Sequence, residues 1–420
     1  MDVEAIKRYY FDFLERDFSN VISRDLDIIE TNKIISVIGP RRVGKSYLFF
    51  DKIKKLEQKG ISRKQIMYLN FENPVLNDLS YKEIKRLLEI FWSLFPESRK
   101  KTYLFIDEPQ VIDKWELAVR ALYDEFNMPI FITGSSSKLL SKEISTSLRG
   151  RTITYELMPL SFKEFLRFKR FNFDYLSTSN KALLLNYINE FLNYGSYPEI
   201  VLNNEKDIIL KNYFEMFLYD IIERYKLRNT FLIKTLVNLI LKSVSKEFSL
   251  NKIFNDLKSQ GYELSKNTLY EYLSILQDSF FIHPLYRYGL KREEKTLPKI
   301  YLNNVGFFNI LFEKELGRKL ENTIFLKLYS DNLKNYEHKI YYYKDQSNEI
   351  DFITKEYAIQ VCYDFSDIMT KQREIKSLKR ISKKLGKKAL LITLDDEKDI
   401  DGIKVISLLK FFVNLKLIYL

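Results

Sequence analysis

The octapeptide GPRRVGKS at residues 39–46 limits the fold of this chain more than any other feature of the sequence. It directly follows the apolar run IISVI and directly precedes a helical pattern. A GxxxxGKS sequence between a strand and a helix matches the P-loop, in which backbone N–H groups surround phosphate groups. Gly39 and Gly44 permit the unusual backbone dihedrals of such a loop, and glycine is otherwise scarce, with 12 in 420 residues.

The chemistry of this loop gives its residues separate roles. Lys45 is expected to reach the β and γ phosphates of ATP, and Ser46 to offer its hydroxyl to Mg²⁺. The positive end of the following helix adds to the field on the phosphates. The alternative is a glycine-containing turn with a surface lysine. The predicted nucleotide-binding residues are Gly39, Pro40, Arg41, Arg42, Val43, Gly44, Lys45, Ser46 and Tyr47.

Polar residues also follow two further apolar runs. Asp107 and Glu108 come directly after YLFI, at the expected carboxyl end of a strand, where parallel sheets bind ligands. Asp107 is suited to hold Mg²⁺ through water, and Glu108 to orient and polarise the attacking water. Thr133 and Ser135 follow IFIT and could sense the γ-phosphate. For all four residues the alternative is an ordinary turn or helix cap.

Between about residues 32 and 157, short apolar runs alternate with helical patterns. The runs are IISVIG, IMYLNF, YLFIDE and IFITG. Such alternation predicts an α/β fold, with a parallel sheet, right-handed crossovers and helices on both faces. We therefore predict a core domain at residues 1–158, followed by a purely helical region at 159–230.

The remaining chain is expected to form two more domains. Two capped helices around Gly261, followed by the strands FFIHPLYRY and KIYL, are typical of a winged helix-turn-helix, which we place at residues 231–304. Residues 305–420 have the order helix, three strands, basic helix and strand, which predicts a separate α/β domain.

Over nearly its whole length the chain resembles the AAA+ (STAND-related) ATPases of archaea and bacteria. The resemblance is carried by GPRRVGKS, LFIDEPQVIDKWELAVRALYD and FITGSSSKLLSKEISTSLRGRTITYELMPLSFKEF, and it continues through YGSYPEIV and YDIIERYKLRN. It implies a P-loop ATPase core, a helical lid, a winged helix and a C-terminal domain of unknown function with a restriction-endonuclease-like fold.

The same resemblance implies roles for individual residues. It places Walker A at residues 39–46, Walker B at Asp107 and Glu108, and sensor 1 around residues 133–135. It also implies a charge-sensing or finger arginine at Arg149 or Arg151. These arginines could reach their own nucleotide, that of a neighbouring subunit, or only solvent.

The C-terminal domain carries an incomplete nuclease pattern. Restriction-like nucleases need two acids to position Mg²⁺ and a lysine to support the attacking water. Glu321 and Asp351 occupy acidic positions of that pattern, but Gln360 and Cys362 stand where an acid and a lysine are needed. We expect lost or much reduced cleavage, with Cys362 as a buried core residue.

The charge of the chain favours polyanionic partners. The formal net charge is +12, and residues 371–388 hold nine basic residues against one acid, Glu374. DNA contact is predicted through this helix and the wing. A solvated face is the alternative for the helix, and a protein-protein or interdomain role is the alternative for the winged helix. The predicted contacts are Arg287, Lys291, Arg292, Lys295, Lys376, Lys379, Arg380, Lys383, Lys384, Lys387 and Lys388.

The composition of the chain excludes several kinds of site and of protein. One cysteine and two histidines exclude an intrachain disulfide and a Cys/His zinc site. Because no run of about 18 uncharged apolar residues occurs, we expect a soluble, cytoplasmic protein with no membrane partner. The sequence favours a Mg²⁺-dependent, ATP-hydrolysing switch that acts on or with nucleic acid. The alternatives are a nucleotide-gated DNA-binding or scaffold protein with negligible turnover and an ATP-regulated nuclease; homo-oligomerisation stays open.

Overall fold

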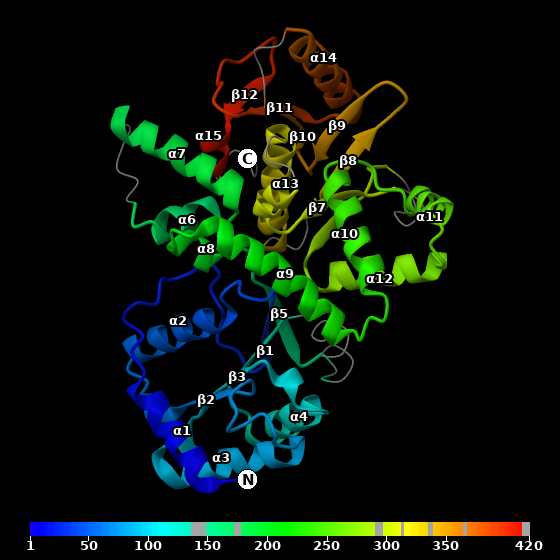
Figure 1. The fold of residues 1–420 in the computed structure, drawn as a ribbon. Helices are drawn as coiled ribbons and strands as arrows, with labels where there is room; N and C mark the ends of the chain where they lie inside the picture. The colour runs from blue at the N-terminus through cyan, green and yellow to red at the C-terminus, as the bar shows by residue number, and fades with distance from the viewer. Residues whose placement is uncertain are drawn as a thin grey trace. The chain divides into compact units, whose positions relative to one another are not determined.

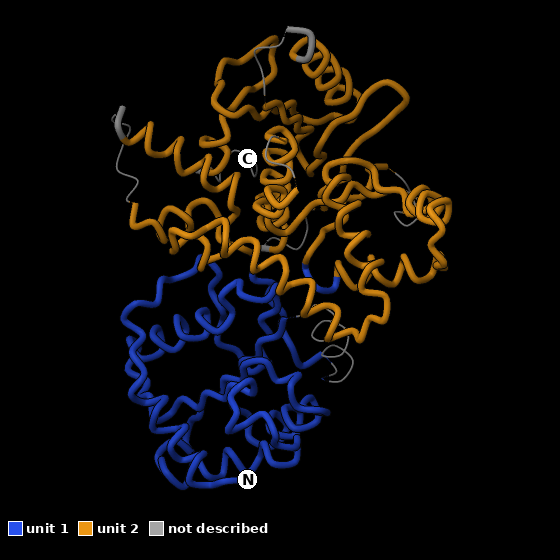
Figure 2. The backbone as a smooth tube through the Cα atoms, in the orientation of Figure 1, with its two compact units in different colours: residues 1–158, 278–280 blue, residues 159–277, 281–420 orange. Residues whose placement is uncertain are grey.

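The structure is a computed structural model of the 420-residue chain. It describes all residues except 136–147, 149, 172–177, 290–296, 312–314, 335–338, 364–367 and 414–420. Two compact units are present (Figure 2). Unit 1 comprises residues 1–158 and 278–280, and unit 2 comprises residues 159–277 and 281–420.

Unit 1 contains a five-stranded parallel sheet in the order β2-β3-β4-β1-β5. The chain passes through the elements in the alternating order that the sequence predicted (Figure 1). The elements are α1 (Val3–Glu15), β1 (Ile34–Ile38), α2 (Lys45–Gln58), η1 (Arg63–Gln65), β2 (Ile66–Asn70), η2 (Tyr81–Glu83), α3 (Ile84–Leu94), η3 (Pro96–Lys100), β3 (Tyr103–Asp107), η4 (Pro109–Val111), α4 (Trp115–Phe126), β4 (Ile130–Gly134) and β5 (Thr152–Glu156).

Helices cover both faces of this sheet, because alternate strand residues point to opposite sides. On one face, Leu104 and Ile106 of β3 belong to a core that also contains residues of α1, α3 and α4. On the other face, Phe105 of β3 stacks on Phe131 of β4 with ring centroids 4.5 Å apart, and Phe49 of α2 packs edge-on against both rings. β1, β3 and β4 are therefore buried along their whole length.

Unit 2 begins with helices and ends with a mixed sheet. Its first part consists of α6 (Phe162–Phe168), α7 (Thr178–Tyr194), α8 (Pro198–Leu202), α9 (Lys206–Arg224), α10 (Thr230–Ser243), α11 (Leu250–Ser259), α12 (Lys266–Asp278), β6 (Ile282–Leu285) and β7 (Lys299–Leu302). β6 and β7 form an antiparallel pair that follows three helices in the chain. Ser249 caps α11 by accepting a hydrogen bond from the Lys252 N–H.

The second part of unit 2 has the sheet order β12-β11-β10-β9-β8. β8, β9 and β10 pair antiparallel, whereas β10, β11 and β12 pair parallel. Leu378 and Ile381 of α14 pack on this sheet in one core. The elements are η7 (Val305–Ile310), α13 (Leu316–Lys334), β8 (Tyr341–Lys344), β9 (Glu349–Ile353), β10 (Tyr357–Cys362), α14 (Ile368–Leu385), β11 (Lys388–Thr393), β12 (Lys404–Ser407) and α15 (Leu408–Val413).

Candidate nucleotide-binding site

The loop between β1 and α2 has the backbone that the glycine pattern requires. Gly39 has φ +154° and Gly44 has φ +98°, conformations that L side chains rarely adopt. A Cβ at Gly39 would lie 2.5 Å from the Leu157 carbonyl oxygen, so only glycine fits there. α2 starts at Lys45, directly after Gly44. The backbone of residues 39–44 therefore forms a strand-to-helix loop at the carboxyl edge of the sheet.

Lys45 lies in the centre of this loop and is 5% exposed. Its Nζ donates hydrogen bonds to the carbonyl oxygens of Gly39 at 3.2 Å and Pro40 at 3.1 Å. It also lies 3.4 Å from Glu108 Oε1. The ammonium group thus bridges the loop and the end of β3, where a triphosphate would need a positive charge.

Asp107 is the centre of a hydrogen-bond network at the end of β3. Its Oδ2 accepts a 2.7 Å hydrogen bond from the Tyr68 hydroxyl, and its Oδ1 accepts one from the Thr133 hydroxyl. Ser46 also hydrogen-bonds to this carboxylate. Burial raises the pKa of Asp107 and repulsion by Glu108 raises it further, while these three hydroxyls oppose the shift. A cation here would relieve the repulsion between the adjacent carboxylates.

The donor set beside the loop fits Mg²⁺. This ion prefers oxygen ligands, keeps several waters and is held by one or two carboxylates together with substrate phosphates. The Ser46 hydroxyl and the Asp107 carboxylate are such ligands, and they lie within hydrogen-bond reach of each other. These are the two residues that the sequence predicted for this role.

Glu108 stands next to this network with its backbone in the left-handed region, at φ +50°. Its N–H donates a 3.0 Å hydrogen bond to Thr133 Oγ1. Thr133 therefore holds both acidic residues, by accepting from Glu108 and donating to Asp107. The predicted sensor threonine thus has a clear structural role in positioning the two carboxylates.

A third acid at the same edge escaped the sequence reasoning. The pairing of Asn70 with Asp107 brings the ends of β2 and β3 together, so Glu72 lies close to the acidic pair. Burial raises the pKa of Glu72, and repulsion by Glu108 adds to the shift. Arg41 of the loop contacts its carboxylate at 3.4 Å. The signal was available, because the run NFE repeats the strand-then-acid pattern of FIDE.

A buried arginine from the N-terminal segment also supports the loop. Arg24 is 7% exposed and donates hydrogen bonds to the carbonyl oxygens of Val43 at 3.1 Å and Met158 at 2.8 Å. It therefore ties the loop to the segment that follows β5. No pattern in the sequence around Arg24 predicted this contact.

The other predicted residues of unit 1 have different outcomes. Ser135 is buried at the end of β4, whereas Arg149 lies outside the described residues. Arg151 directly precedes β5 and pairs with Asp124 at 2.9 Å. Because β5 is parallel to β1, Arg151 lies at the amino edge of the sheet, opposite the loop. This position does not support contact with its own nucleotide, and a role in a neighbouring subunit stays a prediction.

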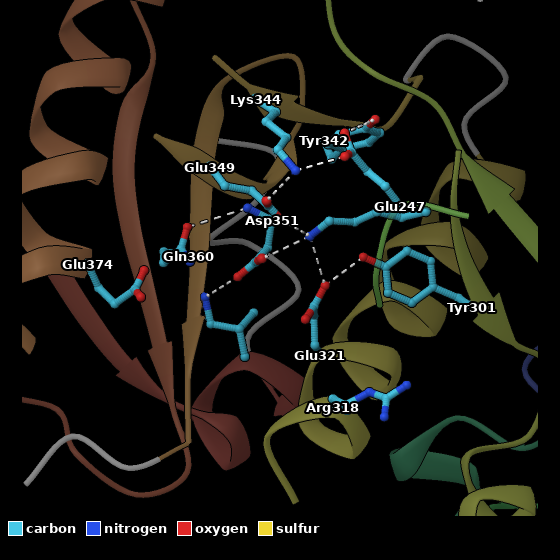
Figure 3. A network of polar contacts seen from close by, with 12 residues as sticks. Glu247, Tyr301, Arg318, Glu321, Tyr342, Lys344, Glu349, Asp351, Gln360 and Glu374 are labelled. Carbon is cyan, nitrogen blue, oxygen red and sulfur yellow. Dashed lines mark hydrogen bonds and ion pairs between the residues drawn. The ribbon is translucent and has the colours of Figure 1, made fainter. Parts of the chain in front are cut away.

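In unit 2 the structure brings together three of the four nuclease-pattern residues. Glu321 of α13 and Asp351 of β9 both contact Lys299, and Gln360 of β10 accepts a hydrogen bond from the Asp351 N–H (Figure 3). Cys362 is instead 5% exposed in the core beneath α14, as predicted. The sequence reasoning did not place Lys299 beside these acids, because it lies in β7, far from them in sequence. The signal that could have indicated a buried lysine was its position as the first residue of the apolar strand KIYL.

Burial raises the pKa of Glu321 from its ordinary value of 4.5 to about 7. The folded state binds the proton of the Glu321 carboxyl group more tightly than the unfolded chain does. The stability that this protonation contributes is therefore complete below pH about 4.5 and is lost as the pH rises through about 7. We expect the melting temperature to fall over this window, and Glu321→Gln to reduce the fall by about 2–4 °C. Calorimetry of both proteins across the window checks this; equal falls would contradict it.

The predicted nucleic-acid contacts divide into two sets. Arg287 is half-buried, whereas Lys291, Arg292 and Lys295 lie outside the described residues. On α14 and the start of β11 all seven predicted residues are described, and Lys387 is only partly exposed. The remaining six are exposed, five on α14 and Lys388 at the start of β11: Lys376, Lys379, Arg380, Lys383, Lys384 and Lys388.

The described part of the chain contains neither a membrane-spanning helix nor a cluster of metal-binding side chains. No helix there is long and apolar enough to cross a membrane. Among the same residues, no group of three or more His, Cys, Asp or Glu side chains could hold a metal ion.

Comparisons with known proteins agree with this geometry. Residues 31–166 match a family model described as an AAA domain, and residues 185–318 match a domain of unknown function. The uncharacterized protein MJ1544 of Methanocaldococcus jannaschii is 39% identical over 394 residues, which cover 90% of this chain and 86% of that protein. An uncharacterized protein of Haemophilus influenzae is 30% identical over 409 residues, covering 94% and 98%.

Among solved structures, the similarity is low. The Aeropyrum pernix ORC1 protein in complex with DNA is 12% identical, with 70% of this chain and 88% of that chain covered and a TM-score of 0.30. AMPPCP-bound DnaA from Aquifex aeolicus is 11% identical, with 80% and 93% covered and a TM-score of 0.25.

Proposed function

This chain belongs to the same family as the uncharacterized protein MJ1544 of Methanocaldococcus jannaschii and contains an AAA domain at residues 31–166, and we propose that it is a Mg²⁺-dependent ATPase that acts as a molecular switch. One observation carries the proposal. Lys45, Ser46, Asp107 and Glu108 come from two separate parts of the sequence and meet at the carboxyl edge of one parallel sheet. This is the combination of groups that ATP hydrolysis needs.

Each of these groups has a distinct task in the proposed reaction. The Lys45 ammonium neutralises charge on the β and γ phosphates, and the loop N–H groups hold their oxygens. Ser46 and Asp107 would hold Mg²⁺, which supplies charge stabilisation at the phosphate oxygens when bound. Glu108 orients a water whose oxygen bonds to the γ-phosphorus while the bond to the β–γ bridging oxygen breaks.

The direct test is steady-state ATP hydrolysis by the full chain with and without Mg²⁺, and with and without duplex DNA. Turnover that requires Mg²⁺ supports the proposal. A protein that binds ATP but shows no turnover above its Lys45→Ala variant would instead be a nucleotide-gated scaffold. That second candidate predicts ADP or ATP bound after purification, because product release would be very slow.

We further propose that the basic face of α14 is the contact surface for a nucleic-acid partner. This face comprises five exposed residues of α14, namely Lys376, Lys379, Arg380, Lys383 and Lys384, and the exposed Lys388 follows at the start of β11. From Lys376 to Lys384 this row spans about 12 Å of the helix at 1.5 Å per residue, and a phosphate backbone can follow such a row. Contact through the predicted winged helix at residues 231–304 and assembly into a homo-oligomer also stay proposals.

Charge reversal tests this surface. In the triple variant Lys376→Glu, Arg380→Glu and Lys383→Glu, we expect weaker binding to duplex DNA of any sequence. The slope of log affinity against log salt should fall by about 0.9 for each lost phosphate contact, so by up to about 2.7. Fluorescence anisotropy at several salt concentrations measures both quantities.

The matched control changes the net charge equally but elsewhere in unit 2. Lys163, Lys181 and Lys211 are exposed on α6, α7 and α9, and their triple reversal to Glu should reduce binding far less. If both triple variants lose the same affinity, net charge decides binding and the basic face is no specific surface.

A further inference from the structure

A buried lysine, Lys299, lies among three carboxylates in unit 2. Figure 3 labels these acids, Glu321, Glu349 and Asp351. Lys299 Nζ is 2.7 Å from Glu349 Oε1, and 3.3 Å from both Glu321 Oε1 and Asp351 Oδ1. The lysine is 1% exposed, and the Glu321 and Asp351 side chains are 14% and 10% exposed. The ammonium group has three N–H donors and three carboxylates to receive them.

The charges of this cluster explain why it needs a cation. Burial alone lowers the pKa of Lys299, but attraction by Glu321, Asp351 and Glu349 raises it well above its ordinary value. Burial likewise raises the pKa of Asp351, because one ammonium cannot fully offset the removal of each carboxylate from water. Three acids thus hold one lysine strongly, and the lysine stays protonated across the ordinary pH range.

We propose that the Lys299 ammonium is the resident cation of this carboxylate site and closes it to divalent metal ions. Carboxylates that converge in this way are the usual ligands of Mg²⁺ or Mn²⁺. Here the position that faces all three is occupied by Nζ. The inference does not depend on the proposed ATPase activity.

The lysine belongs to the β6–β7 pair, which is held firmly against α13. Tyr301 stacks on Phe325 with ring centroids 4.2 Å apart, and its hydroxyl donates to Glu321 at 2.7 Å. The Asn322 side chain accepts from the Leu302 N–H at 2.7 Å and donates to the Leu302 carbonyl at 2.9 Å. Lys299 itself pairs with Leu285 of β6 and forms an isolated bridge with Glu247, so its backbone is held on both sides.

A second set of contacts joins the same region to the C-terminal sheet. Tyr342 of β8 exchanges backbone hydrogen bonds with Tyr286 and Tyr288, at 3.0 and 2.7 Å. Lys344 of β8 pairs with Glu247 at 2.8 Å. The β6–β7 pair and the C-terminal sheet therefore form one continuous body around the carboxylates. The buried ion pairs of Lys299 thus stabilise the packing of these elements on one another. We do not expect metal-dependent cleavage of nucleic acid at this site.

The test is Mn²⁺ binding by the nucleotide-free full chain, measured by electron paramagnetic resonance. All proteins carry Asp107→Asn, so that the candidate nucleotide site contributes no Mn²⁺ binding. We expect no specific Mn²⁺ site in this parent. Its Lys299→Ala derivative should bind one Mn²⁺ at least about tenfold more tightly than any residual binding by the parent, because an ammonium 3.3 Å from the carboxylates no longer repels the ion. Adding Asp351→Asn should abolish the new site.

Lys344→Ala is the matched control, since this neighbouring lysine also contacts Glu349 but is 38% exposed. It should not open the site. Circular dichroism verifies that each variant is folded. A folded Lys299→Ala protein without a Mn²⁺ site would overturn the proposal.

Mn²⁺ binding by the parent that disappears on Asp351→Asn would overturn it as well. That measurement requires no change at Lys299, so it decides the matter even if Lys299→Ala does not fold.

Discussion

Replacing Lys45 by alanine is expected to abolish ATP turnover and to weaken ATP binding strongly. Lys45 is the buried cation that bridges the loop carbonyls and Glu108, so its removal takes away the positive charge facing the β and γ phosphates. Loss of one preorganised electrostatic group costs about 10²- to 10³-fold in rate. Steady-state hydrolysis and titration with a fluorescent ATP analogue measure the two effects.

A lysine just beyond the other end of the same helix provides the control. Lys59 directly follows α2 and is 64% exposed, so Lys59→Ala should leave both binding and turnover unchanged. Thermal melting of Lys45→Ala separates a loss of function from a loss of folding. A folded Lys45→Ala protein that hydrolyses ATP at the rate of the parent would rule out this loop as the ATPase site.

Replacing Glu108 by glutamine is expected to stop hydrolysis while ATP binding remains. The amide keeps the size of the side chain, and the Glu108 N–H can still donate to Thr133, so the backbone at the end of β3 is preserved. What disappears is the carboxylate that orients and polarises water, a contribution of about 10²- to 10⁴-fold. Single-turnover hydrolysis and ATP binding should be measured on the same preparation.

Glu72→Gln is the matched control for this substitution. Glu72 stands at the same edge and contacts Arg41, but 51% of its side chain is exposed, which favours a smaller effect of at most a few-fold. If Glu72→Gln abolished hydrolysis and Glu108→Gln did not, the assignment of the water-orienting residue would move from the end of β3 to the end of β2.

The apolar runs in the sequence predicted four of the five strands in this sheet, β1 to β4. The fifth strand, β5, was not predicted. β1, β3 and β4 are uniformly buried because helices cover both faces of the sheet, so their sequences are continuous apolar runs. β5 reads TITYE and is half-buried along its length, since it pairs with β1 alone at the edge. A half-buried edge strand leaves only a weak apolar signal in the sequence.

The candidate nucleotide site could be predicted because its groups occupy fixed positions relative to local elements. A P-loop lies between one strand and the next helix, and acids at strand ends reach the same edge in any parallel sheet. Thr133 could be placed by the same reasoning, but its two hydrogen bonds, to Asp107 and from Glu108, required the actual strand order. Arg24 could not be found, because its contacts join segments far apart in the sequence.

The sequence by itself determined the loop at residues 39–46, the acids after β3 and the alternation of strands and helices, because each depends on neighbours within a few residues. Only the tertiary structure decided that Arg151 lies at the amino edge of the sheet and that Lys299 of β7 lies among Glu321, Asp351 and Glu349. The physical reason is that strand pairing and burial bring charges together across long stretches of chain. Local patterns carry no information about such encounters.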